Sequence, residues 1–511
     1  MYKRTFISLW KRAVVHASTR TFLIWEKPDG KVESWTYDQF DHVVENLARW
    51  LASSGVRHGS FIYLLLNNSP AFVALWLSAI RLGAVMVPAD PKSTAREIAI
   101  HIEKTKPLVA FCTEANAGVC EQAVLDVPAH LRPSVIKIDE SGLEGFSDAF
   151  CDVNMPLPEE KVDPKDFACV MFTSGTTSSP KGVVVTQANY AWAGEVMSYV
   201  SYLTSNDRQL VVLPLFHANA QYYSFASAIA VGASVALMPR FSASQFLEVA
   251  SKYNATHASL FAAPIRMILA RSTGDPKVKL KNVWYAQNIT ADEYEHFSHL
   301  VGCKPRQLYG MTETIPAVIT NPLLEPRHNA MGMPTIGCEV SLMDLKEPKV
   351  ISEPGVVGQI VVKGERGISL FLEYLGDPET TENSFVDGWF LTGDLACKDN
   401  DGYFYFHGRK SEILKVSGEN VSTVEIEAVL AEHPDVLEAA VVGEKDPIRD
   451  EVPVAFVVLK PSADKLSEED LLKWCSQRLS SVKVPRKIFF VSELPRTSVG
   501  KIRKFMLRKQ A

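Results

Sequence analysis

The chain has 511 residues, more than one hydrophobic core usually organises, so we expect two or more domains. Its composition, with 47% hydrophobic and 22% charged residues, is ordinary for a soluble globular protein. The net charge of −6 and the lack of a basic tract with interleaved aromatic residues argue against a nucleic-acid partner.

No targeting signal is evident in the sequence. The first 20 residues lack an uninterrupted apolar segment, and the last residues are not a peroxisomal address. The apolar stretch 71–88 approaches the length of a membrane span, but Arg81 and Gly83 interrupt it, so we predict a buried helix followed by a strand. The eight cysteines form no C-x-x-C pair, which predicts buried, reduced thiols rather than disulfides or a zinc site. We therefore expect a cytoplasmic protein without a transmembrane segment.

Strand-like and helical stretches alternate through the first part of the chain. Apolar strand patterns at 60–67, 107–113 and 134–139 are interspersed with helical patterns such as 69–83. The alternation resumes with further short apolar runs, beginning at 208–216. This order predicts a doubly wound α/β fold with mostly parallel sheets.

Further along, after about residue 325, the pattern becomes β-rich with tight turns, and the last hundred residues have a compact α+β pattern. We expect an N-terminal domain at 1–409, with a β-rich subdomain over about 325–409, and a C-terminal α+β domain at 410–511.

Two helices are predicted in the C-terminal part from their first residues. Ser422 and Glu425 have the spacing of a capping box, in which the two side chains satisfy backbone N–H groups at the helix start. Ser467 and Asp470 mark the start of the second helix.

Residues 172–182, "FTSGTTSSPKG", form a turn rich in hydroxyl groups after an apolar run. The turn is not a Walker P-loop, because no glycine directly precedes Lys181 and no hydroxyl residue follows it. Its glycine backbone, hydroxyl groups and lysine nevertheless suit an anion. From this stretch alone, a solvated Ser/Thr-rich loop is the alternative.

Four further stretches contain candidate functional residues. In "LPLFHANAQ", His217 follows an apolar run, although such a histidine is often a satisfied, partly buried residue. In "LYGMTETIP", Glu313 could hold Mg²⁺ together with phosphate, or the turn could begin a helix. In "GWFLTGDLACKDNDGYFYFHGRK", Asp394 and Arg409 could bind a ribose, or the aspartate could lie in a surface turn. In "LPRTSVGKIRK", Lys501 could serve a site or belong to a solvated basic tail.

Taken together and in order, these stretches resemble the ANL superfamily of AMP-forming adenylating enzymes. The resemblance covers nearly the whole chain and rests on "TSGTTSSPKG", "YGMTET", "GWFLTGD", "GRKSEILKVSGENVS" and "PRTSVGKIRK". Within the superfamily, "GENVSTVEIEAVL", "VVGEKDPIRDE" and "KVPRKI" are similar to acyl-CoA ligases of the crotonobetaine/carnitine type. The resemblance implies that the small C-terminal domain is mobile.

The resemblance also implies a set of site residues that share contact with ATP. The implied phosphate loop comprises Thr173, Ser174, Gly175, Thr176, Thr177 and Lys181. The implied contacts to adenine, ribose and the α-phosphate are Ala286, Gln287, Asn288, Tyr309, Gly310, Thr312, Asp394 and Arg409.

Other roles implied by the resemblance concern the metal, the acid and the second substrate. Glu313 is expected to hold Mg²⁺, His217 to border the acyl pocket as a gate, and Lys501 to position the acid and offset charge. After the small domain rotates, Gly418 and Glu419 are expected to lie beside the coenzyme A tunnel. Two places depart from the family pattern: Ser411 stands at the hinge, where aspartate or lysine is usual, and "YAQNIT" replaces paired glycines.

The implied reaction is the ATP-dependent ligation of a small carboxylic acid to coenzyme A through an acyl-adenylate, releasing AMP and pyrophosphate. The implied cofactors are ATP, Mg²⁺ and coenzyme A. One alternative passes the acyl group to a carrier protein or an amine. The other is an inactive nucleotide-binding regulatory protein, which the retained Lys501, Glu313, Lys181 and Asp394 disfavour.

Overall fold

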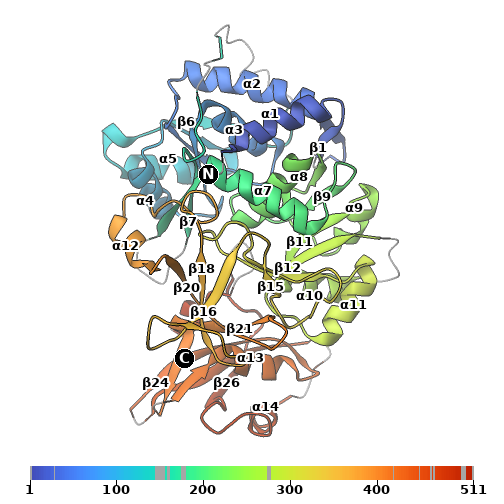
Figure 1. The fold of residues 1–511 in the computed structure, drawn as a ribbon, viewed down its shortest axis with the longest axis vertical. Helices are drawn as coiled ribbons and strands as arrows, with labels where there is room; N and C mark the ends of the chain where they lie inside the picture. Colours follow the sequence, from blue (N-terminus) through green and yellow to red (C-terminus); the bar gives the residue numbers. More distant parts are fainter. Residues whose placement is uncertain are drawn as a thin grey trace.

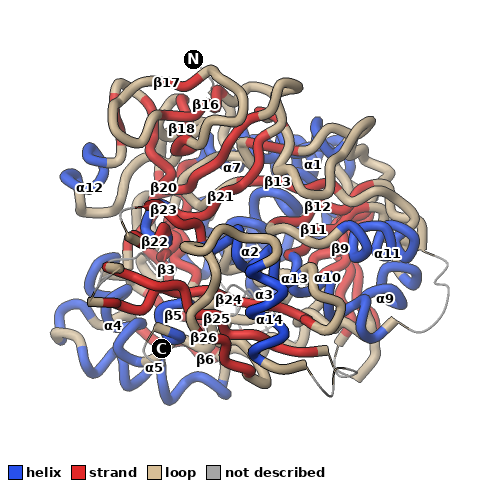
Figure 2. The backbone as a smooth tube through the Cα atoms, turned by 90° about the horizontal axis from the view of Figure 1, so that it is seen from below, coloured by secondary structure: helices blue, strands red, loops and turns tan. Residues whose placement is uncertain are grey.

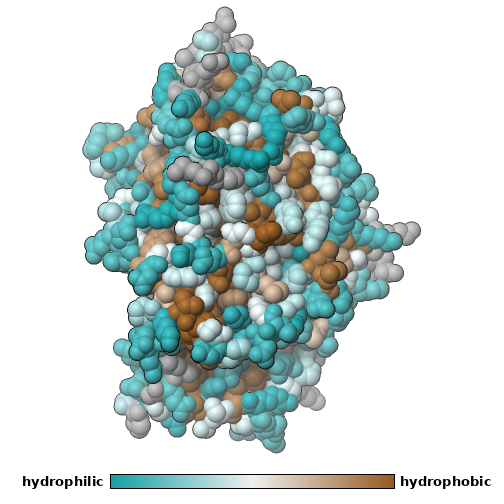
Figure 3. Space-filling view, viewed as in Figure 1, coloured by the Kyte–Doolittle hydropathy of each residue, from teal (hydrophilic) through white to brown (hydrophobic). Residues whose placement is uncertain are grey.

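The computed structural model describes residues 3–27, 29–143, 156–157, 161–173, 180–272, 278–417, 419–447, 449–460, 463, 466–496 and 502–508. Figure 1 shows an elongated molecule, with helix-covered sheets at one end and the segment after residue 410 at the other. The face drawn in Figure 3 is mostly hydrophilic, and its apolar residues form separate small groups. None of the described helices combines the length and apolarity needed to cross a bilayer.

One mostly parallel sheet is built near the N-terminus. Its described strands are β3 (Phe61–Leu65), β4 (Val85–Pro88), β5 (Val109–Cys112), β6 (Ser134–Lys137), β7 (Phe167–Thr173) and β8 (Lys181–Thr186). They lie in the order β6-β5-β3-β4-β7-β8, and β8 alone runs antiparallel to its neighbour among these described strands. The strands β4 and β5 are buried throughout because helices cover both faces, which explains their continuous apolar sequences.

The second large sheet is also mostly parallel. Its described strands are β1 (Thr21–Glu26), β2 (Val32–Thr36), β9 (Arg208–Val211), β10 (Ser234–Leu237), β11 (His257–Phe261), β12 (Asn282–Ala286), β13 (Arg306–Tyr309), β14 (Ile319–Thr320) and β15 (Met333–Pro334). Their order is β15-β14-β13-β12-β11-β9-β10-β1-β2. The six strands from β13 to β1 are parallel, and the antiparallel strands lie at the two edges.

A layer of helices is shared by the two sheets. Its helices are α1 (Phe6–Ala17), α2 (Tyr37–Ser53), α3 (Pro70–Leu82), α7 (Gln187–Ser201), the π-helix η2 (Asn219–Phe225) and α8 (Ala226–Val231). One buried apolar cluster joins this layer to both sheets, and within it the Phe6 ring stacks on Trp76 and Tyr190. The helix predicted within 71–88 is α3, which ends at Gly83 in the left-handed conformation before β4 begins.

Two outer helical layers complete this part of the molecule. They consist of α4 (Ala95–Thr105) and α5 (Glu114–Asp126) on the first sheet, and α9 (Phe246–Lys252), α10 (Ala262–Arg271) and α11 (Ala291–Val301) on the second. In Figure 2 these two groups lie on opposite sides, with α2 and α3 between them. The prediction of a doubly wound α/β fold is therefore confirmed.

A third, antiparallel sheet follows. Its described elements are β16 (Glu339–Met343), β17 (Val350–Ile351), β18 (Gly358–Lys363), α12 (Pro378–Asn383), β19 (Phe385–Val386), β20 (Trp389–Lys398) and β21 (Phe404–Arg409). Its apolar cluster also takes in Val183, Tyr309 and Val318, so the sheet packs against the ends of the two larger sheets.

The C-terminal segment forms a separate sheet with its own apolar clusters. Its described elements are η3 (Lys410–Glu412), β22 (Ile413–Val416), β23 (Glu419–Ser422), α13 (Thr423–Ala431), β24 (Val436–Asp446), β25 (Asp450–Leu459), α14 (Glu468–Ser476), β26 (Lys487–Phe490) and α15 (Lys504–Leu507). The buried residues of these two clusters all lie beyond residue 413. The predicted helix start at Ser467 is confirmed, and Ser467 and Asp470 form a capping box there.

The predicted capping box at the start of α13 is wrong. The Ser422 hydroxyl makes no capping bond to the helix and donates instead to the carbonyl of His407, at 2.7 Å. Glu425 forms an ion pair with Lys483 at 2.7 Å rather than reaching back to the helix start. Both side chains have tertiary partners, which the sequence spacing cannot reveal.

The prediction of buried thiols holds for four of the described cysteines, whereas Cys303, Cys338 and Cys397 are half-buried. Seven free thiols are present in the described chain, and those of Cys112, Cys120, Cys169 and Cys475 are buried. Cys151 lies outside the described residues.

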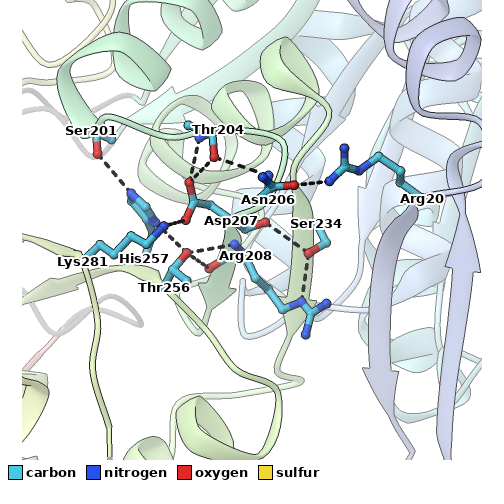
Figure 4. Close-up of polar contacts among 10 residues, drawn as sticks. All are labelled: Arg20, Ser201, Thr204, Asn206, Asp207, Arg208, Ser234, Thr256, His257 and Lys281. Atoms are coloured by element: carbon cyan, nitrogen blue, oxygen red, sulfur yellow. Dashed lines mark hydrogen bonds and ion pairs between the residues drawn. The ribbon is translucent and has the colours of Figure 1, made fainter.

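A polar network joins the amino ends of several strands in the second sheet (Figure 4). Lys281, just before β12, pairs with Asp207, just before β9, at 2.6 Å between Nζ and Oδ1. The backbone N–H and hydroxyl of Thr204 donate to the other Asp207 oxygen at 2.8 and 2.7 Å. Arg208, on β9, donates to the hydroxyl of Ser234, on β10, at 2.9 Å and so links the two strands. These bonds fix the strands at the edge opposite their carboxyl ends.

The network holds Asp207 in its ionised form. Burial alone would raise the pKa of this carboxyl, but the hydrogen bonds from Lys281 and Thr204 outweigh it and lower the pKa to about 2. A lowered pKa stabilises the fold above the unfolded value of 3.8, and this contribution is lost as the pH falls toward 2.

We predict that Lys281→Met lowers the free energy of unfolding at pH 7 by about 1–2 kcal/mol, because the buried Asp207 carboxylate loses a charge-assisted hydrogen bond that solvent around the exposed lysine weakens. Urea unfolding between pH 7 and pH 3 measures the effect. The difference in free energy of unfolding between the variant and the unaltered protein should become smaller below pH 4, because Asp207 becomes protonated as the pH falls toward 2. Lys165→Met, which removes an exposed pair with Glu365, is the control and should change stability little. An equal effect of the two substitutions would contradict the prediction.

Candidate active site

Several candidate residues lie where parallel strands end. Ala286 is the last residue of β12 and Tyr309 is the last residue of β13, while His217 follows β9 by six positions. Because β9, β12 and β13 are parallel, these residues lie at one edge of the sheet. Ligands of open α/β sheets bind at this edge.

Tyr309, Asp394 and Arg409 form one cluster. The Tyr309 hydroxyl donates to Asp394 Oδ2 at 2.8 Å, and Arg409 Nε lies 3.2 Å from Oδ1. Asp394 and Arg409 are register partners on β20 and β21. Gly393 precedes Asp394 with a φ of 76°, a conformation that favours glycine, and it turns the chain so that the carboxylate is buried against Tyr309.

The chemistry of this cluster suits the binding of uncharged hydroxyl groups of a ligand. Burial, reinforced by the neighbouring Asp394 carboxylate, raises the pKa of Tyr309 well above its usual value, so its hydroxyl stays a donor. A carboxylate oxygen can accept more than one hydrogen bond, so the Asp394 carboxylate is of the type that binds hydroxyl groups.

Glu313 lies in a second cluster with Tyr374 and Lys181. Its side chain is 5% exposed, and the Tyr374 hydroxyl donates to Oε1 at 3.0 Å. The Lys181 ammonium lies 4.7 Å from the centroid of the Tyr374 ring, a cation–π contact. Burial raises the pKa of Glu313, and the Tyr374 hydrogen bond and the charges of Lys181 and Arg409 oppose that rise. No helix begins at Glu313, so the interpretation of this turn as a helix start is wrong.

Glu313 fits a magnesium ion that is shared with a bound phosphate. Mg²⁺ commonly uses one or two carboxylates together with phosphate oxygens, and a single buried carboxylate with incomplete charge compensation supplies such a ligand. The described part of the chain has no group of three or more His, Cys, Asp or Glu residues that could hold a metal unaided.

The two ends of the predicted phosphate loop meet at the antiparallel strands β7 and β8. Thr173 and Lys181 are register partners there. Lys104, on α4, donates to the carbonyl of Pro180 at 2.9 Å and fixes the start of β8. Ser174, Gly175, Thr176 and Thr177 lie outside the described residues, as do Gly418 and Lys501.

The turn after Tyr309 packs closely against η2. A side chain at Gly310 would place its Cβ 2.6 Å from the Tyr223 hydroxyl and 3.1 Å from Ala317, so only glycine fits without a shift. The Tyr222 hydroxyl donates to the carbonyl of Thr312 at 3.4 Å. The π-helix and the turn therefore lie in direct contact at the edge of the sheet.

His217 precedes η2 and is half-buried. Burial lowers the pKa of this histidine to about 4, although the charge of Asp90 opposes the shift, so the imidazole is neutral near pH 7. Its ring lies 4.5 Å from that of Phe216. A neutral, partly buried ring suits the border of an apolar pocket.

The segment after β12 is held in an unusual conformation. Gln287 is exposed and has a φ of 72°, in the left-handed region that few side chains adopt. Gln307 donates to the Asn288 side-chain oxygen at 2.8 Å, and Arg266 donates to the Asn288 carbonyl at 3.1 Å. These bonds hold the segment next to β13.

Sequence reasoning missed two residues of this region. Tyr374 joins Glu313 to Lys181, but it occurs in "FLEYLG", which contains no charge pattern that marks a site. Gln307 anchors Asn288, and only the burial of a polar residue on β13 identifies it. Glu419, by contrast, is exposed on β23 of the C-terminal segment and belongs to neither of the two clusters.

Comparisons with known proteins agree over most of the chain. The profile of the AMP-binding enzyme family matches residues 9–375, and that of the AMP-binding enzyme C-terminal domain matches residues 425–501. A crotonobetaine/carnitine–CoA ligase of Proteus mirabilis is 33% identical over 505 residues, which cover 97% of each chain.

Solved structures show the same similarity. The anthranilate CoA ligase AuaEII in complex with anthranoyl-AMP has a TM-score of 0.88 at 25% identity, covering 100% of this chain and 97% of its own. A benzoate CoA ligase from Burkholderia xenovorans has a TM-score of 0.87 at 25% identity, covering 99% of both chains.

We predict that Tyr374→Phe raises the pKa of Glu313 further, because the charged form loses a hydrogen bond. Binding of Mg·ATP is measured by calorimetry between pH 8 and pH 5. As the pH falls, binding to the variant should weaken at a higher pH than binding to the unaltered protein does. Tyr285→Phe, which removes a hydroxyl that donates to the His328 carbonyl at 2.8 Å, is the matched control. An unchanged pH profile in Tyr374→Phe would show that this hydroxyl does not tune the carboxylate.

Proposed function

The chain belongs to the AMP-binding enzyme family, and from this premise we propose that it joins a small carboxylic acid to coenzyme A with ATP as the energy source. The observation that carries the proposal is the pairing of two clusters at one sheet edge. One, Glu313–Tyr374–Lys181, suits a metal-bound polyphosphate, and the other, Tyr309–Asp394–Arg409, suits a ribose.

The chemistry explains why such clusters are needed. A carboxylate is a poor electrophile, so its oxygen first attacks the α-phosphorus of ATP and expels pyrophosphate. The thiol of coenzyme A then attacks the acyl carbon of the resulting adenylate and releases AMP. In the first step one anion approaches another, so cationic groups must offset the repulsion. Bound Mg²⁺ would supply part of this charge compensation through Glu313 and the phosphate oxygens.

The proposed role of each described residue follows from its position. Lys181 and Thr173 flank the phosphate loop, and the Lys181 ammonium neutralises the departing pyrophosphate. Asp394 accepts hydrogen bonds from the ribose hydroxyls, while Arg409 fixes the carboxylate. Thr312, whose carbonyl accepts from Tyr222, stands beside the α-phosphate.

The remaining proposed contacts concern adenine and the acid. Adenine lies along Ala286, Gln287 and Asn288 and against Tyr309 and Gly310. The sequence YAQNIT stands here where the resemblance implies paired glycines. His217 borders the acyl pocket as a neutral gate.

We propose a domain boundary between Arg409 and Lys410. The buried apolar residues beyond this point form clusters of their own, which is expected of a segment that moves as a body. Lys501 would enter the site for adenylation, and rotation at Ser411 would then replace it with Gly418 and Glu419 for thioester formation.

Lys504 supports this arrangement. Its ammonium pairs with Glu427 at 2.7 Å and Glu412 at 3.3 Å, and it donates to the Thr423 hydroxyl at 3.1 Å. Helix α15, which begins three residues after Lys501, is thereby anchored to α13 and to η3 at the proposed hinge.

The acid and the acceptor are part of the same proposal. Similarity to the crotonobetaine/carnitine–CoA ligases favours a small acid and coenzyme A. Transfer to a carrier protein or an amine is the alternative acceptor. The free thiols at the described cysteines favour a reducing compartment such as the cytoplasm.

The test of the function is acid-dependent exchange of labelled pyrophosphate into ATP, followed by comparison of acceptors. We expect exchange with at least one acid of a broad panel and thioester formation with coenzyme A. A holo-carrier protein or an amine as the better acceptor would overturn the second step alone. Failure of exchange with every acid would favour an inactive nucleotide-binding protein.

We predict that Lys501→Ala lowers adenylation by about 10²-fold or more while sparing thioester formation from supplied acyl-AMP, because the lysine acts only in the first step. Pyrophosphate exchange and coenzyme A thiolation are measured separately. Arg508→Ala, at an exposed basic residue of the same tail, is the control. Equal loss of both half-reactions in Lys501→Ala would contradict the proposed division of labour.

A further inference from the structure

Asn219 is a buried amide whose oxygen lacks a partner. The residue is 8% exposed, and its Oδ1 has no hydrogen-bond partner within the described part of the chain. A buried acceptor without a donor destabilises a fold, because it has lost its water without a replacement. Such a group in an otherwise well-packed region points to a partner that the protein itself does not supply.

The neighbouring buried amides are satisfied, so the region is not generally poor in hydrogen bonds. The Asn68 oxygen accepts from the backbone of Leu215 at 2.7 Å, and its nitrogen donates to the carbonyls of Leu213 and Met238. Gln221, two residues after Asn219, accepts from Tyr190 and donates to the carbonyl of Leu215. Asn219 is therefore the exception within its own helix.

The position of Asn219 relates it to the proposed acyl pocket. It is the first residue of the π-helix η2 and follows His217 by two positions. In a helix with i→i+5 hydrogen bonds, Asn219 and Tyr223 lie one turn apart on the same side. The Tyr223 hydroxyl adjoins Gly310, so this side of η2 faces the turn that carries Thr312. π-Helical turns are rare and frequently occur at functional sites.

We propose that Asn219 is a specificity-determining residue whose amide oxygen accepts a hydrogen bond from a hydroxyl group of the acid. The preferred substrates are then hydroxy acids, and the corresponding acids without the hydroxyl group leave the buried oxygen unpaired. A site built around such a hydrogen bond rejects the analogue that lacks the group more strongly than an apolar pocket rejects an extra hydroxyl. This assignment rests on the proposed adenylation function.

The test compares acids that differ by one hydroxyl group. Butanoate is compared with its 2-, 3- and 4-hydroxy derivatives, and benzoate with its three hydroxy derivatives, by kcat/KM in pyrophosphate exchange. We expect one hydroxy acid to exceed its parent by at least about tenfold. In Asn219→Leu, which has a similar shape but no acceptor, the ratio should fall toward one.

Controls separate specificity from folding. Gln221→Leu removes an amide with two internal partners, so it should lower the thermal midpoint and leave the hydroxy-to-parent ratio unchanged. Asn219→Leu should be at least as thermostable as the unaltered protein. Asn219→Ala, which cannot overpack the pocket, should lower the ratio in the same way.

The outcomes distinguish this assignment from the function on which it rests. Exchange with equal kcat/KM for parent and hydroxy acids, or a ratio that persists in both Asn219 variants, overturns the role of Asn219 and leaves adenylation intact. The absence of exchange with every acid overturns adenylation and the role of Asn219 together.

Discussion

Parallel strands place all their carboxyl ends at one edge of a sheet, and this constraint determines where the candidate residues lie. The opposite edge is fixed by polar bonds, of which the Asp207–Lys281 pair joins the starts of β9 and β12. With the amino ends held, the loops that follow the strands are free to differ in sequence and to carry chemistry. Tyr309 and Ala286 end adjacent parallel strands, so the sheet holds both at the same edge before any ligand binds.

Two buried carboxylates in the site are compensated to different degrees. Asp394 lies next to a guanidinium on one oxygen and a phenol on the other. Glu313 receives a phenol hydrogen bond, but the nearest ammonium described for its cluster lies on the face of the same phenol ring, and burial raises its pKa. A carboxylate whose negative charge is balanced by neighbouring groups is suited to binding uncharged hydroxyl groups. A carboxylate whose charge is only partly balanced is suited to binding a cation. The proposed roles, ribose for Asp394 and Mg²⁺ for Glu313, follow this difference in electrostatics.

The sequence predicted the fold class well, because apolar strand patterns and helical periodicity are local signals. It located α3 within 71–88 and the start of α14 at Ser467, since caps and glycine stops are short-range features. It failed at Ser422, whose hydroxyl bonds to His407 across a tertiary contact. The candidate site was reached by resemblance of motifs rather than by composition. Tyr374 escaped notice because an aromatic residue in an apolar run acquires its role only through Glu313 and Lys181, which are distant in sequence.

The Lys504 contacts bear on how one small domain could serve two reactions. Burial disfavours the charged form of Lys504, but Glu427 and Glu412 outweigh this and raise its pKa, so the ammonium stays charged. It therefore binds α15, α13 and η3 into one unit. A rotation at the proposed hinge would carry the tail with Lys501 and the strand β23 with Glu419 together. Because the two segments are fixed to the same body, withdrawing one from the site and presenting the other would need a single motion and no refolding of either segment.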